Sequence, residues 1–271
     1  MAYLSVPGVN PAGIFFAFGL ALVISGWWFR APLPVQPMKA IGAGIATLPG
    51  STVATLASAS LATGAFWVLV SASGLSGKIS KWVPKSVVAG ISVGLAFALA
   101  SQALKLITVD PYGAMDMIGT FSVLEKLGIV GIVGAVGIPL LSYGLSRLTK
   151  LPLILWLLAL ATGYAALVSP VEFRLVYSTP VAFTMPSFGI GEITLSDFAY
   201  GAIFLALPQF PVTLGNAVVS VTREMNRLYP HAEVTENTMM KTTGWMNVLS
   251  GCFGGIPMCH GSGGVAAYSA F

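Results

Sequence analysis

Two stretches decide the fold: Leu33-Pro34-Val35-Gln36-Pro37-Met38-Lys39-Ala40 and Gly255-Ile256-Pro257-Met258-Cys259-His260-Gly261-Ser262-Gly263-Gly264. Both place a proline and polar groups after an apolar residue, and both continue into a short apolar tail. Proline removes a backbone donor and stops a preceding helix, so each stretch is expected to be extended backbone that leads into a new helix. Pro37 suits the first turn of the first of these helices.

Both new helices are predicted to be too short to cross a membrane. A helix from Pro37 to Leu48 rises about 18 Å, roughly half of a ~30 Å hydrocarbon core, so its N-terminus would lie near the bilayer midplane. The second half-helix would run from Met258 to Phe271. Two helix N-termini that converge at this depth form an anion site, and paired broken helices indicate a transporter's substrate site. The alternative is two proline kinks in full-length helices, which would not need Gln36, Lys39 and His260.

Composition predicts an all-α integral membrane protein with several spans, in the plasma or inner membrane and in contact with lipid. Of 271 residues, 56% are hydrophobic and 8% are charged, against about 25% charged residues in soluble domains. The mean hydropathy is +0.86 and the pI is about 9.1. Because the basic residues lie singly in loops between apolar runs, they fit the positive-inside rule and not a nucleic-acid surface.

Apolar windows predict the spans and their orientation. The windows are Pro11–Phe29, Pro37–Leu48, Val53–Ser73, Pro84–Leu106, Leu127–Leu148, Leu151–Val168, Ser196–Thr222, Thr238–Phe253 and Met258–Phe271. Alternate loops on one side carry nine basic residues, against three on the other side. The first side is therefore predicted to be cytoplasmic. This orientation places the N-terminus outside, as expected if one helix precedes it.

Three motifs in the same order resemble the molybdate transporters of the sulfate-permease superfamily. They are residues 33–40, Ala206-Leu207-Pro208-Gln209-Phe210-Pro211-Val212-Thr213-Leu214-Gly215-Asn216-Ala217, and residues 254–261. Lys241-Thr242-Thr243-Gly244 with Met246-Asn247 is similar to the link into the last motif. The resemblance spans nearly the whole chain.

The resemblance implies a UraA-like or SulP-like fold, a seven-plus-seven inverted repeat with two half-helices that meet at the membrane midplane. It implies a core, the substrate-binding part, at 1–75 and 196–271, and a gate at 76–195. The chain is expected to be a fragment that lacks the first helix and the last four. The implied function is secondary active transport of a tetrahedral oxyanion, molybdate, by alternating access.

Gln36 and Gln209 are the expected substrate donors, because a neutral amide binds an oxyanion without the full charge that would trap it. The alternative role is an interhelical amide bridge. Lys39 lies one turn into the first half-helix, where a buried cation suggests an anionic counter-charge or a partner carboxylate. The predicted spans contain no carboxylate in their interiors, which favours the anion; the alternative is that Lys39 snorkels to the interface. Thr213 and Asn216 follow Gln209 by about one and two turns on a similar face.

The two polar stretches complete the expected binding set with Pro37, Met38, Met258, Cys259, His260 and Gly261. A histidine side chain ordinarily titrates near neutral pH, so His260 could couple H+ to the anion, although a lone histidine more often holds structure. No cofactor or metal is expected, because the spacing of Cys252 and Cys259 fits neither a disulfide framework nor a zinc site.

Rival functions stay open at this point. They are a sulfate or other anion permease, a nucleobase permease of similar fold, an anion channel and a non-transporting fragment; a homodimer is left open too. An enzyme is not expected, because the chain lacks HExxH and GxSxG, and Gly77-Lys78 is not a P-loop.

Overall fold

The computed structural model describes Tyr3 and residues 6–48, 50–82, 86, 90, 93–94, 97, 129–168, 178, 185–186 and 190–269. The chain divides into two units, which are described separately. The first comprises Met1–Leu95 and Phe183–Phe271, and the second comprises Ala96–Ala182. The predicted split into a core at 1–75 and 196–271 and a gate at 76–195 stays a prediction.

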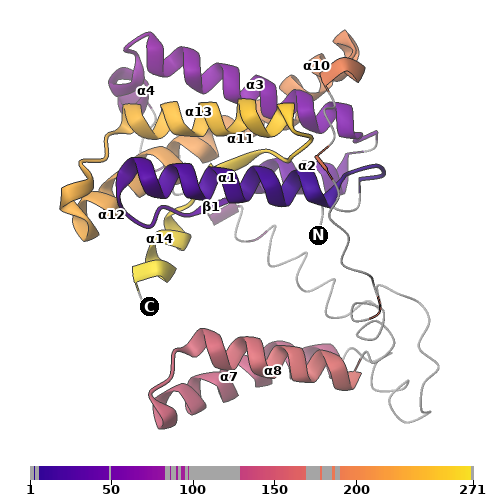
Figure 1. Cartoon of the computed structure of the whole chain (residues 1–271), viewed down its shortest axis with the longest axis vertical. Helices are drawn as coiled ribbons and strands as arrows, with labels where there is room; N and C mark the ends of the chain where they lie inside the picture. Colours follow the sequence, from indigo (N-terminus) through magenta and orange to yellow (C-terminus); the bar gives the residue numbers. More distant parts are fainter. Residues whose placement is uncertain are drawn as a thin grey trace. The chain divides into compact units, whose positions relative to one another are not determined.

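Three long helices form the frame of the first unit: α1 (Pro11–Phe29), α3 (Val53–Ala72) and α13 (Glu236–Cys252). Helix α13 lies between α3 and α1 (Figure 1). Capping boxes at Thr52 and Thr235 start α3 and α13 by satisfying backbone donors of the first turn. The windows predicted for these three helices agree with the structure to within two residues.

Glycines allow α3 and α13 to pack closely. A Cβ added to Gly64 would lie 2.7 Å from the backbone nitrogen of Val248, and one added to Gly244 would lie 2.7 Å from that of Val68. No side chain fits at either position. Small residues of this kind are the usual means by which membrane helices approach each other.

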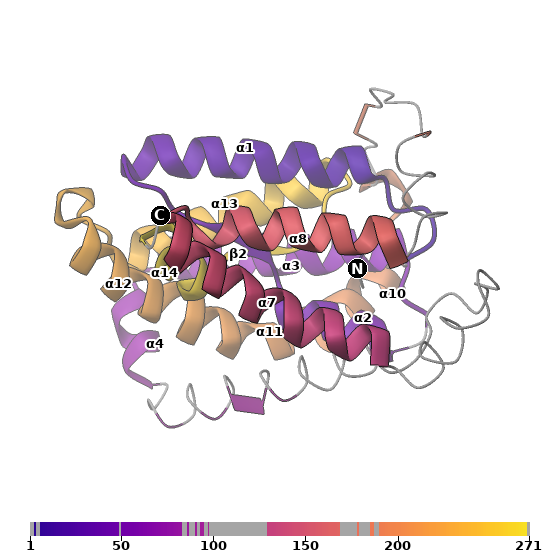
Figure 2. The same ribbon diagram turned by 90° about the horizontal axis from the view of Figure 1, so that it is seen from below.

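Each predicted half-helix is preceded by a short strand. Strand β1 (Val35–Pro37) leads into α2 (Lys39–Thr47), and β2 (Met258–His260) leads into α14 (Ser262–Ser269). The strands are antiparallel, with Val35 opposite His260 and Pro37 opposite Met258. Helices α2 and α14 extend from the strand pair in opposite directions (Figures 1 and 2).

The pairing corrects two predicted boundaries. Pro37 does not begin a helix, because it is the last residue of β1; Met258 begins β2 and not a helix. The physical reason is the strand partner, since Met38 donates its backbone N–H to Pro257 O at 2.9 Å and thereby prolongs the extended conformation. With 9 and 8 residues, α2 and α14 are still shorter than expected, about 12 to 14 Å long.

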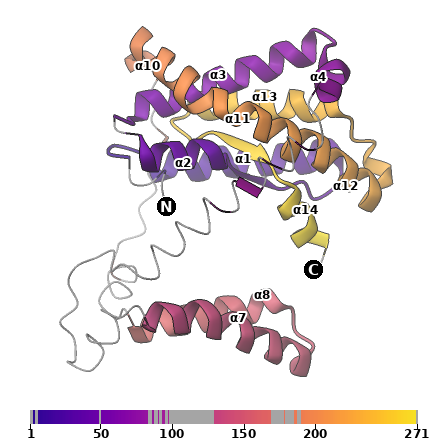
Figure 3. The same ribbon diagram turned by 180° about the vertical axis from the view of Figure 1, so that it is seen from behind.

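Helix α13 holds β2 in place (Figure 3). Asn247 accepts a hydrogen bond from Met258 N at 2.9 Å and donates one to Met258 O at 2.6 Å. Ser250 donates to Ile256 O at 2.7 Å, and the Tyr3 hydroxyl donates to the carbonyl of Met38, the residue between β1 and α2. These bonds satisfy backbone groups that would otherwise remain unpaired inside the membrane.

The window predicted as Ser196–Thr222 is a longer apolar helical run, Leu195–Leu228. It consists of α10 (Leu195–Tyr200), the π-helical η3 (Gly201–Ala206), α11 (Leu207–Val212), the π-helical η4 (Thr213–Ser220) and α12 (Val221–Leu228). Pro208 and Pro211 lie within α11. Proline interrupts the regular helical bonds, and π turns beside it take up the irregularity.

The remaining elements are short or belong to the second unit. In the first unit they are α4 (Ser76–Trp82), η2 (Ile190–Glu192) and η5 (Pro230–Ala232). In the second unit α7 (Ile129–Thr149) packs against α8 (Leu153–Val168), in agreement with the predicted windows. The window Pro84–Leu106 lies almost entirely outside the described residues.

The structure predicts that Asn247→Leu destabilises the protein strongly. The substitution leaves two buried groups of Met258 unpaired, and each such group costs about 1 to 3 kcal/mol. The melting temperature in detergent should therefore fall by several degrees. Asn237→Leu is the matched control, because Asn237 is an exposed residue of the same helix. Equal losses in the two variants would contradict the role assigned to Asn247.

Candidate functional site

The candidate site lies where α2 and α14 begin. A single residue separates each helix from the strand of the β1–β2 pair that precedes it, so the first turns of the two helices lie close to the strand pair. The exposed amides and the dipole of a helix N-terminus favour negative charge. Within the described part of the chain, every acidic residue lies outside both strands and both half-helices.

Gln209 caps the start of α2. Its Oε1 accepts a hydrogen bond from Ala40 N at 2.8 Å, and its Nε2 donates to Thr213 Oγ1 at 3.1 Å. Because a backbone N–H requires an acceptor, this contact fixes which way the amide points. Met38, the N-cap residue, supplies no side-chain hydrogen bond of its own. Gln209 and Thr213 are both fully buried.

Asn216 makes a similar contact with the start of α14. The hydroxyl of Ser262, the first residue of α14, donates to Asn216 Oδ1 at 2.7 Å. Gln209 and Asn216 belong to the same long helical run. One element therefore reaches the first turns of both half-helices with two neutral amides.

Gln36 places a free donor at the same point. Its Nε2 atom is buried and has no hydrogen-bond partner among the described residues. The side-chain amide lies directly against Gly261, where an added Cβ would be 1.7 Å from Nε2. Gly264 also has no room for a side chain, because an added Cβ would lie 2.5 Å from Pro34 Cβ. The two glycines thus allow the start of α14 to pack on β1.

His260 ties β2 to both of its neighbours. Its Nδ1 lies 3.1 Å from Pro34 O, and its Nε2 lies 3.1 Å from Thr242 Oγ1 on α13. A carbonyl oxygen can only accept, so Nδ1 carries a hydrogen. The ring is fully buried. This arrangement fits the structural alternative for His260, and proton coupling stays a prediction.

The other predicted site residues divide into two groups. Lys39 is partly exposed at the first position of α2 and forms no ion pair within the described residues, and Pro37 is exposed. Met38, Met258 and Cys259 are buried in the hydrophobic core. The structure therefore brings to the half-helix starts Gln36, Lys39, Gln209, Thr213, Asn216 and Gly261. The three buried side chains instead pack in the hydrophobic core.

Sequence reasoning missed the residues that support the site. Asn247, Ser250 and Thr242 hold β2 through side-chain hydrogen bonds, and Ser262 contacts Asn216. A polar side chain within an apolar helix is a usable signal, since membrane helices bury such groups only with a partner. Asn247 had been noted only as part of a linking motif.

The fold and site define an integral membrane protein in which two short helices begin next to one pair of strands, and every acidic residue of the described chain lies outside these four elements. Residues 1–99 and 201–271 match the family described as "Molybdate transporter of MFS superfamily". This match covers more than half of the chain, and the chain therefore belongs to this family of molybdate transporters. The resemblance found in the motifs is confirmed, as is the expectation that the family is not one of enzymes.

Two curated relatives from Arabidopsis thaliana are similar over most of the chain. Molybdate transporter 2 is 27% identical over 93% of this chain and 60% of the relative. Molybdate transporter 1 is 26% identical with the same coverage. The chain thus spans about 60% of the length of both relatives.

A solved structure confirms the predicted fold class. It is the transmembrane domain of a cyanobacterium bicarbonate transporter, BicA, which matches with a TM-score of 0.59 and 16% identity. The match covers 99% of this chain and 74% of that domain. The prediction of a SulP-like fold with two half-helices is therefore correct.

The contact between Gly261 and Gln36 predicts a difference between two neighbouring glycines. Gly261→Ala drives a methyl group into the Gln36 amide and should cost about 1 to 3 kcal/mol, as overpacking does. Gly263→Ala is the matched control, because no atom lies within 4 Å of its added Cβ. Thermal unfolding in detergent should show a lower melting temperature for Gly261→Ala only. A wild-type melting temperature for that variant would show that Gln36 does not pack there.

Proposed function

We propose that the protein carries molybdate across the plasma or inner membrane as a secondary transporter that works by alternating access. Membership of the molybdate-transporter family and the similarity to two plant molybdate transporters support this proposal. Sulfate, which is also a tetrahedral dianion, is the competitor that the same chemistry would admit. We assign substrate binding to the first unit, because the broken helices lie there.

The unpartnered Nε2 of Gln36 is the observation that carries the proposal. A buried donor without an acceptor costs about 1 to 3 kcal/mol, so a site that retains one gains when a ligand supplies the acceptor. A tetrahedral oxyanion offers acceptors in every direction and no donor. Gln36 lies against Gly261, at the start of α14, where the helix dipole also favours negative charge.

Gln209 would exchange partners when the anion binds. Without ligand, Gln209 Oε1 satisfies Ala40 N. An anionic oxygen is a better acceptor for that N–H than a neutral amide oxygen is. Rotation of the side chain would then release Oε1 from α2 and present Nε2 to the anion. The amide bridge and the substrate contact are in this view two states of one side chain.

Lys39 would supply charge without contributing a fixed ion pair. It is the first residue of α2 and has no carboxylate partner in the described residues. A cation at the site is costly when the site is empty and favourable when a dianion is bound. Coupling of H+ to the anion through His260 is a further part of the proposal, supported by the position of His260 at the end of β2, two residues before α14 begins.

Exchange of amide for carboxylate tests the proposal. In Gln209→Glu the carboxylate keeps the acceptor at Ala40 and strengthens the cap of α2, so the melting temperature should stay near the wild-type value. The negative charge should repel a dianion, and because like charges placed together cost several kcal/mol, molybdate uptake should fall about a hundredfold or more. Gln36→Glu should lose uptake for the same reason.

Asn237→Asp is the matched control, because it makes the same amide-to-carboxylate change at an exposed position of α13. Uptake of radiolabelled molybdate by cells, normalised to protein in the membrane, gives the readout. Gln209→Leu separates the two roles of Gln209, since it removes the cap as well and should lower stability. Wild-type uptake by both glutamate variants would remove Gln36 and Gln209 from the substrate site.

A further inference from the structure

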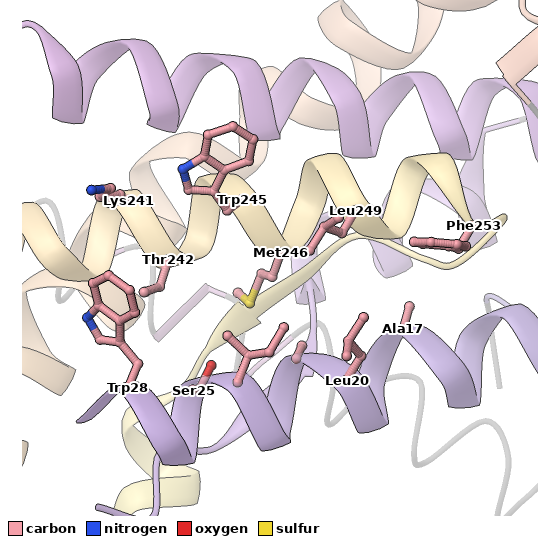
Figure 4. A pocket seen from close by; sticks show the side chains of 12 residues that line it. Ala17, Leu20, Ser25, Trp28, Lys241, Thr242, Trp245, Met246, Leu249 and Phe253 are labelled. Carbon is pink, nitrogen blue, oxygen red and sulfur yellow. The ribbon is translucent and has the colours of Figure 1, made fainter. Parts of the chain in front are cut away.

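An apolar groove runs between α1 and α13. Its volume is about 240 Å³. Figure 4 shows the lining side chains along the two helices, with Ala17 and Phe253 at one end and Trp28 and Lys241 at the other. Leu20, Met246 and Leu249 lie between these ends (Figure 4). A groove of this kind between membrane helices has to be filled by apolar atoms, from protein or from lipid.

The Trp28 end of the groove is cationic and aromatic. Lys241 Nζ lies 5.9 Å from the centre of the Trp28 ring. Trp28 also lines a second pocket of about 360 Å³, together with Gly26, Trp27 and Arg30. His231 Nε2 lies 3.2 Å from Arg30 O and so joins the end of α1 to the segment before α13. The groove and the second pocket therefore adjoin at Trp28.

Neither Lys241 nor Arg30 forms an ion pair with a carboxylate of the described residues. The ion pair found in the described part of the chain is Arg227 with Glu224, and it involves neither residue. Both cations are exposed. Arg30 directly follows α1 and Lys241 lies in the second turn of α13, and the charge bias assigns both residues to the cytoplasmic side. Basic pockets between helices on that side attract anionic lipid headgroups, and tryptophan is enriched at the headgroup level.

We propose that this groove binds one anionic phospholipid, with an acyl chain along Leu20 and Leu249 and the phosphate between Lys241 and Arg30. The apolar length with two cations at one end matches the division of a phospholipid into tail and charged head. Thr242 lines the same groove and contacts His260 Nε2 at 3.1 Å. A bound lipid would therefore pack against the helix face that holds β2, although its binding does not depend on what the site transports.

The first test compares two lipids that differ in headgroup charge. The whole chain is purified in detergent and titrated with dioleoyl phosphatidylglycerol or dioleoyl phosphatidylcholine, and the melting temperature is followed. We expect phosphatidylglycerol to bind the wild type more tightly and to raise its melting temperature more. The double variant Arg30→Gln with Lys241→Gln should lose roughly tenfold or more of that preference.

The matched control is Lys78→Gln with Arg223→Gln, which removes the same charge from exposed residues of the same predicted side. A preference that survives in this control and disappears in the groove variant supports the site. Equal effects of the two lipids on the wild type, or equal losses in the two double variants, overturn it.

The second test fills the groove. Leu249→Trp, or Ile24→Trp if the first variant is unstable, should reduce the phosphatidylglycerol that is retained in native mass spectrometry. Leu69→Trp is the control, because Leu69 is 68% exposed on α3 and does not line the groove. Unchanged retention in a folded groove-filling variant means that protein, either a second copy or another segment, covers the groove, and the proposal fails.

Discussion

The structure depends on the pairing of backbone groups along and beside the antiparallel strands β1 and β2. A backbone donor or acceptor left unpaired in hydrocarbon costs several kcal/mol. In this protein a strand replaces the helical turns before α2 and before α14, so the backbone groups there need other partners. The two strand segments supply some of these partners to each other. One example is the hydrogen bond from Met38 N, just after β1, to Pro257 O, just before β2. Asn247 supplies the remainder for Met258, with one amide that both donates and accepts. The close contact of α13 with α3 gives that amide a rigid support.

The same pairing produces the chemistry of the site. Because the strands replace the helical turns that would normally precede α2 and α14, the first amides of both helices face a common point. The long helical run then reaches the two starts with Gln209 and Asn216, and Gln36 adds a donor that the described protein does not satisfy. The positive potential comes from backbone dipoles and Lys39. A dianion can leave such a site more easily than one that holds several fixed cations, since neutral hydrogen bonds are weaker than charge-assisted ones.

The sequence was sufficient for the parts of this arrangement that are local. Hydrophobic windows predicted α1 with its observed bounds, and the prolines located both interruptions. It was insufficient wherever the decisive partner is distant. Pro34 and His260 lie 226 residues apart, so the strand pairing that removes Pro37 from α2 leaves no local pattern. For the same reason Gln209 was predicted as a substrate donor beside an open alternative, and only the contact with Ala40 identifies it as a cap.

Locating the anion itself is the most direct test of the central claim. Molybdenum scatters anomalously, so diffraction data collected at its absorption edge from crystals grown with molybdate would show its position without reference to side chains. The account predicts one anomalous peak between the first turns of α2 and α14, within hydrogen-bond distance of Gln36 Nε2, with Gln209 Oε1 withdrawn from Ala40 N. A peak confined to the basic residues of the loops, or a peak between the half-helices with Gln209 still bonded to Ala40, would contradict it.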